Sequence, residues 1–120
     1  MDSATLLKTA VVLLGLTAGG GLVMAIMRFT GMDRPPSWLA MLHGLLAAGG
    51  LTLLLYAALA GDVGTVVWTG IALLVLAAIG GTVINLGYHD KGLPLPKSFV
   101  IGHAVLAVIG FALISVRAFG

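Results

Sequence analysis

Cysteine is absent from this chain of 120 residues, and charged residues are scarce, at 8%. Without cysteine there is no disulfide, no thiolate metal site and no cysteine nucleophile. The sequence also lacks a phosphate-binding loop, an H-E-x-x-H motif and a serine–histidine–acid set. Most enzymatic chemistries therefore have little support. The four acids all lie at the terminus or in connections: Asp2, Asp33, Asp62 and Asp90.

What the sequence does have is apolar surface, with 60% hydrophobic residues and a mean hydropathy of +1.18. A soluble domain of this size cannot bury so much of it. The composition therefore predicts an integral membrane protein in contact with the lipid bilayer. The net charge of +2 comes from a few residues near segment ends, which is typical of a topology signal and not of a nucleic-acid surface.

Four charge-free runs cover residues 9–27, 35–61, 63–88 and 98–116. A helix needs roughly 20 residues to cross the hydrocarbon layer, so each run provides one crossing. Prolines in the two long connections mark helix ends. We expect helices at about 5–27, 38–60, 65–87 and 99–119. The predicted fold class is all-α, an integral membrane four-helix bundle in a single transmembrane domain, residues 1–120; the apolar runs are too long for a barrel.

The chain matches itself when it is shifted by 60 residues, without a gap. We therefore predict two tandem helical hairpins, residues 1–60 and 61–120, related by a pseudo-twofold axis along the membrane normal. The first helix is then the counterpart of the third, and so a structural element rather than a cleaved signal. We expect the matched stripes to face the bundle interior, including Thr5, Thr9, Leu13, Leu16, Gly20 and Val23 on the first helix. Further matches include Pro36, His43 and Gly50 with Pro96, His103 and Gly110.

Two histidines lie in the apolar runs, His43 in the second and His103 in the fourth. A histidine in hydrocarbon is costly and marks a functional site by default. Both are four or five residues from the end of the bundle that holds the two long connections, hereafter the loop end. The second and fourth helices of such a bundle are diagonal, with axes roughly 11–14 Å apart. We expect this gap to keep the two imidazoles apart and to suit a histidine–iron–histidine arrangement with a flat macrocycle between them.

Glycines and basic residues accompany the histidines at the loop end. Gly20, Gly21, Gly80 and Gly81 lie at the same level on the first and third helices, where they would make room for a macrocycle, although glycine also serves close helix packing. The third histidine, His89, is expected to be a solvated loop residue. Candidate partners for the anionic propionates of a haem are Arg28, Arg34 and Lys97, with Lys91 nearby.

The motif H-[GA]-x-L-A-x-x-G at 43–50 and 103–110, on core helices, resembles the four-helix b-type cytochromes of respiratory membranes at the level of architecture. The resemblance implies one non-covalent haem b per chain, bound by His43 and His103. Because there is no second histidine pair, electron transfer across the whole membrane is in doubt. The resemblance favours an electron-transfer protein or a subunit of a redox complex over a stand-alone enzyme. The partner would be quinol, a redox protein or a larger respiratory complex.

Two other hypotheses remain open at this stage. One is a structural subunit without a cofactor, in which the histidines would bond to backbone carbonyls across the bundle. The other is a small metal or solute transporter. The basic residues number four at the loop end and two, Lys8 and Arg117, at the other end. We therefore expect the loop end in the cytoplasm, both termini outside, and a bacterial inner membrane as the location.

Overall fold

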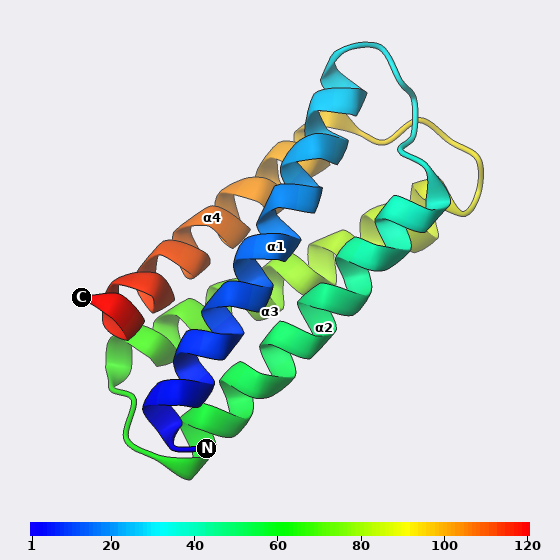
Figure 1. The fold of residues 1–120 in the computed structure, drawn as a ribbon. Coiled ribbons are helices and arrows are strands. Elements are labelled where there is room, and N and C mark those ends of the chain that lie inside the picture. Colours follow the sequence, from blue (N-terminus) through cyan, green and yellow to red (C-terminus); the bar gives the residue numbers. More distant parts are fainter.

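The computed structural model describes all 120 residues and contains helices and connections but no strand. Four antiparallel helices form the bundle, and a π-helical turn continues the third. The termini and the short connection lie at one end and the two long connections at the other (Figure 1). The elements are α1 (Ser3–Phe29), α2 (Ser37–Ala60), α3 (Thr65–Ile84), the π-turn η1 (Asn85–His89) and α4 (Lys97–Phe119).

Each of the four helices is long and apolar enough to cross a membrane. This confirms the predicted all-α bundle and identifies the chain as a membrane-embedded protein. The predicted helices are all present, with ends that differ from the prediction by no more than three residues. The one element that the sequence did not predict is η1, since the third helix was expected to run on in α-helical form to residue 87.

Helix starts follow local capping chemistry. The backbone N–H of Thr5 donates to the Asp2 carboxylate at 2.7 Å, which caps α1. This hydrogen bond holds the pKa of Asp2 below its usual value. Pro36 and Pro96 are the N-caps of α2 and α4, positions that suit a residue without an N–H. Both prolines therefore precede helices, as predicted for the prolines of the two long connections.

Within each hairpin, glycine allows the helices to pack closely. A β-carbon on Gly50 of α2 would lie 2.8 Å from the Leu14 side chain of α1. At the equivalent place in the second hairpin, a β-carbon on Gly110 would lie 3.0 Å from the Leu74 side chain. These distances are shorter than carbon–carbon contact allows. The same glycine–leucine contact thus holds α1 against α2 and α3 against α4.

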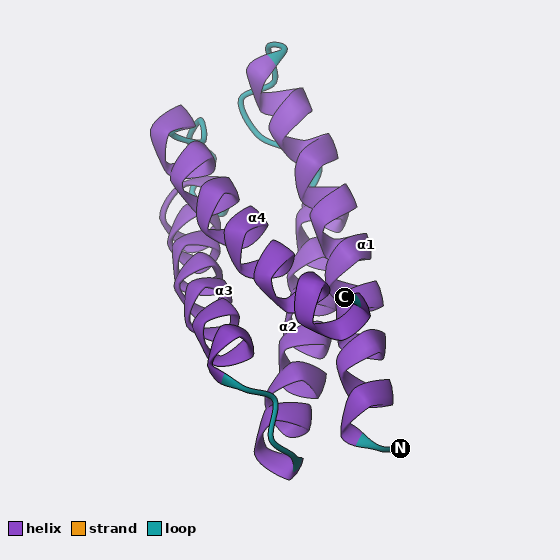
Figure 2. Ribbon diagram, turned by 90° about the vertical axis from the view of Figure 1, so that its left-hand side faces the viewer, coloured by secondary structure: helices purple, strands orange, loops and turns teal.

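The main cluster of buried apolar residues occupies the half of the bundle near the termini. At the loop end buried residues are few: Leu39 of α2 and Ile84 of α3, with Pro35 and Leu95 in the connections. In Figure 2 the two hairpins form two layers that lean apart towards the loop end. The core cluster consists of Leu7, Ala10, Val11, Leu14, Leu54, Ala58, Val63, Val67, Ile71, Leu74 and Ile114.

The predicted inward stripe of α1 is wrong at several positions. Leu16 is 59% exposed and Val23 is 45% exposed, and Thr5 is exposed as well. The face that packs in the bundle instead carries Leu7, Ala10, Leu14 and Thr17. The reason is that positions facing lipid must also be apolar, so an apolar identity between the repeats does not indicate burial.

Candidate cofactor site

The structure brings His43 of α2 and His103 of α4 together across the bundle. Their ring centroids are 6.2 Å apart and the ring planes cross at 73°. The expectation that the diagonal gap keeps the imidazoles apart is therefore wrong. That expectation was based on the distance between the helix axes. The Cα atoms lie about 2.3 Å from each axis, and the side chains extend further inward, so the rings are much closer than the axes. Both residues are half-buried.

Each imidazole is held by a backbone carbonyl of its own hairpin. His43 Nδ1 lies 2.8 Å from Thr17 O on α1, and His103 Nδ1 lies 2.6 Å from Ala77 O on α3. Thr17 and Ala77 are 60 residues apart, as are the two histidines. Because a carbonyl oxygen only accepts, each Nδ1 carries the proton and donates. In a neutral ring this leaves a lone pair on each Nε2, the state in which histidine binds metals.

The paired glycines lie directly against these rings. A β-carbon on Gly21 would be 2.8 Å from His43 Cε1, and one on Gly81 would be 3.0 Å from His103 Cε1. The neighbouring Gly20 and Gly80 are looser, with hypothetical β-carbon contacts of 3.9 and 4.0 Å to the same rings. The glycines therefore make room for the imidazoles, which is a different neighbour from the macrocycle edge that we expected for them.

The ligand set at this place is two histidines and nothing else. No group of three or more histidine, aspartate or glutamate side chains comes together anywhere in the chain. A closed zinc site takes four protein ligands and a catalytic one takes three. Two imidazoles suit a metal whose other ligands arrive with it, as the four nitrogens of a porphyrin do.

The basic residues at the loop end are engaged in part with the protein itself. Arg28 Nε donates to Leu95 O at 2.8 Å, and Arg34 donates to Gly92 O. The Lys97 ammonium lies 5.5 Å from the centre of the Phe29 ring, a cation–π contact, and Lys91 is exposed. Their predicted contact with haem propionates stays a prediction.

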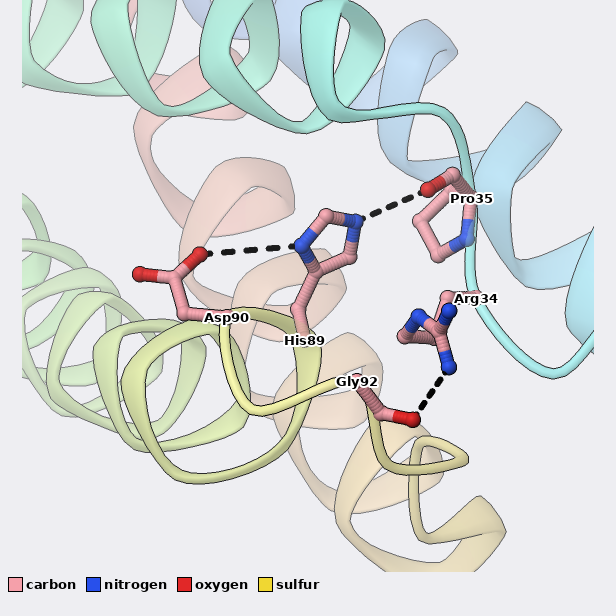
Figure 3. Close-up of polar contacts among 5 residues, drawn as sticks. All are labelled: Arg34, Pro35, His89, Asp90 and Gly92. Carbon is pink, nitrogen blue, oxygen red and sulfur yellow. Dashed lines mark hydrogen bonds and ion pairs between the residues drawn. The ribbon is translucent and has the colours of Figure 1, made fainter.

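His89 differs from the expectation of a solvated loop residue. Its side chain is only 9% exposed, and its Nε2 donates to Pro35 O at 2.8 Å (Figure 3). Its Nδ1 faces the Asp90 carboxylate at 3.7 Å. These residues border an open pocket of about 550 Å³ between the two long connections, with Asp33, Arg34 and Ser37 also in its wall. The expectation failed because the π-turn, invisible in the sequence pattern, turns His89 towards the other hairpin.

The structural-subunit hypothesis expected the histidines to bond to backbone carbonyls, but sequence reasoning did not identify the acceptors, Thr17 O and Ala77 O, or their place in the same hairpin as each histidine. A backbone acceptor has no residue signature, so only the level of the histidines relative to the matching helix pointed to it. The glycine pairs 20–21 and 80–81 did mark that level. The chain matches no protein-family model, and no curated protein or solved structure shows significant similarity to it.

Proposed function

We propose that this chain binds one haem b non-covalently, with His43 and His103 as the axial ligands, and serves electron transfer in a bacterial inner membrane. The observation that carries the proposal is the symmetric pair of imidazoles, each fixed through Nδ1 to a carbonyl and separated by 6.2 Å between centroids. A metal held between the two imidazoles, with metal–nitrogen bonds of about 2 Å, would need a centroid separation of about 6 Å.

The residues around His43 and His103 orient these two side chains; none of them is proposed to contact a substrate. The carbonyls of Thr17 and Ala77 fix the orientation of the rings and make each Nε2 a stronger donor to a metal. Gly21 and Gly81 allow the rings to lie close to α1 and α3. When bound, the haem supplies a one-electron iron couple, and two strong axial ligands leave no position for oxygen activation. Electron transfer is therefore the function that this ligand set supports best.

Partner and orientation complete the proposal. A site nearer one face of the membrane suits a relay between a quinol pool and a redox protein, or a subunit of a larger respiratory complex. The excess of basic residues at the loop end favours its location in the cytoplasm, with both termini outside. On this orientation the haem lies nearer the cytoplasmic face.

The test is haem content with the two ligands replaced in turn. His43→Ala and His103→Ala are each expected to abolish stable haem binding, since one imidazole cannot make the bis-histidine site. Leu45→Ala and Val105→Ala are matched controls, because these two residues occupy equivalent exposed places two residues after each histidine, at 66% and 50% exposure. Low-spin bis-histidine spectra retained in both histidine variants would refute the proposal.

One observation favours a second candidate, a cofactor-free structural subunit. A centroid separation of 6.2 Å lies within the range of direct aromatic edge contacts, so the histidine pair is able to bridge the hairpins by itself. On this hypothesis the protein stays colourless when haem is offered, and His43→Ala lowers its thermal stability all the same. Haem content and stability measured on the same samples separate the two functions.

A further inference from the structure

The spacing of the two histidines needs an explanation, because the core cluster does not include their surroundings. All eleven core residues belong to the half of the bundle near the termini. Around His43 and His103 only a few residues are buried, among them Thr17, Leu39 and Ala77, and none of them belongs to the core cluster. Packing within the core cluster therefore holds the hairpins together mainly at the end near the termini. Some other contact has to set the distance between the hairpins at the loop end.

Two hydrogen bonds from helix-borne side chains cross between the hairpins at the loop end. Arg28, near the end of α1, donates to Leu95 O, and His89, at the end of η1, donates to Pro35 O. Both bonds are 2.8 Å long. Each acceptor stands one residue before the N-cap of the helix that carries a histidine. The bonds therefore run in opposite directions, each from the first helix of one hairpin to the start of the second helix of the other.

The π-turn makes the two bonds equivalent. A π-turn holds one residue more than an α-turn, so the residues after it are displaced by one in register. The N–H of Met32 donates to Met27 O at 3.0 Å, and the N–H of Leu93 donates to Tyr88 O at 2.9 Å, a spacing of 61 residues. The glycines with positive φ that follow, Gly31 at 122° and Gly92 at 72°, are also 61 residues apart.

By the same spacing of 61 residues, His89 corresponds to Arg28. The ungapped match, at a spacing of 60, pairs His89 with Phe29 instead. The connection after Gly92 is one residue shorter than the one after Gly31, which restores the spacing of 60 at Pro36 and Pro96. An insertion in the helix and a deletion in the connection thus offset one another. The first helix of each hairpin therefore ends with a donor side chain at the same place, and each donor bonds to the other hairpin.

We propose that Arg28 and His89 form a two-sided clamp that sets the spacing of His43 and His103. Each acceptor, Pro35 or Leu95, precedes its histidine by eight residues, about 12 Å along a helix axis. A shift of the clamp is carried through the rigid start of α2 or α4 to the imidazole. Arg28 and His89 are thus positioning residues, and the consequence for a haem rests on the proposed function.

Further contacts between the two connections support the clamp. The N–H of Leu95 donates to Asp33 O at 3.0 Å, and Arg34 donates to Gly92 O. Leu95 is buried, with 6% exposure, and Pro35 is buried too. The clamp therefore lies in a packed region, and loss of a single side-chain bond frees one side of it without unfolding the connection.

The experiment measures distances between spin labels in the full chain, reconstituted in lipid. The absence of native cysteine makes single-site labelling clean. One pair replaces Met41 and Ile101, which are equivalent exposed residues near the histidines. The reference pair replaces Tyr56 and Val116, which are equivalent exposed residues in the half that holds the core.

His89→Leu removes the donor and His89→Gln keeps an N–H donor. His89 is chosen because an Arg28 variant also removes a predicted propionate contact.

We expect His89→Leu to broaden and lengthen the distances of the 41–101 pair while the 56–116 pair stays as in the parent, and His89→Gln to restore the 41–101 distances. Unchanged 41–101 distances in His89→Leu, or equal changes in both pairs, would overturn the clamp. Haem content is recorded on the parent protein and on each variant. A colourless parent protein with responsive distances rejects the proposed function and keeps the clamp. A parent protein that binds haem, but whose 41–101 distances do not respond to His89→Leu, supports the proposed function and rejects the clamp.

Discussion

Gly21 of α1 lies so close to His43 of α2 that a β-carbon at position 21 would be 2.8 Å from the imidazole Cε1. The same relationship holds between Gly81 and His103 at 3.0 Å. In each hairpin the ring is therefore confined between a backbone carbonyl that accepts from Nδ1 and a glycine that lies against Cε1. Both orienting contacts of a histidine come from the neighbouring helix of the same hairpin.

Gly21→Ala is predicted to displace the His43 ring and to weaken cofactor binding. Overpacking at such a contact costs about 1–3 kcal/mol. Haem per chain and thermal stability both measure the effect. Gly19→Ala is the control, because a β-carbon there meets nothing within 4 Å. Equal haem content in the two variants would contradict the confinement of the ring.

Gly50→Ala and Gly110→Ala are predicted to destabilise the hairpins without touching the histidines. A β-carbon at either place meets a leucine side chain of the neighbouring helix within 3.0 Å, and the expected loss of unfolding free energy is again about 1–3 kcal/mol. Denaturation in detergent measures it. Gly49→Ala, which places its β-carbon in open space, is expected to behave like the parent. A loss of stability in Gly49→Ala as large as in Gly50→Ala would show that helix packing is not the cause.

Deletion of Gly87 is predicted to keep the clamp. Removal of one residue converts η1 to a regular α-turn and leaves His89 where it was relative to the start of α3. Insertion of one alanine after Ile84 is the contrasting variant, since a further residue rotates His89 by about 100° around the helix. The 41–101 label distance checks both. A deletion variant that behaves like the insertion variant would argue against the register shift.

Single cysteines are predicted to report both termini outside the cell. Cysteine at Ser3 is expected to react in intact cells with a reagent that does not cross membranes, and cysteine at Lys91 only after the cells are opened. The four basic residues at the loop end are the physical reason. Labelling at Lys91 in intact cells would reverse the orientation and place the histidines near the outer face.

The sequence predicted the fold and its histidine pair for a clear reason. Long apolar runs leave few alternatives to transmembrane helices, and matched residues such as His43 and His103 mark the repeat in spite of apolar bias. The direct approach of the rings was missed because axis separations say little about side-chain reach. The role of His89 was missed because a π-turn has no sequence signature. One trace of it exists, since no identity at a spacing of 60 occurs between residues 24 and 35.

The central claim is that His43 and His103 hold one haem. The most direct measurement is an oxidised-minus-reduced absorption spectrum of the detergent-purified chain, with haem counted per chain and with His43→Ala and His103→Ala beside it. The account predicts sharp low-spin bands at one haem per chain, absent from both variants. A protein that stays colourless after haem is offered, or a spectrum that both variants retain, would contradict it.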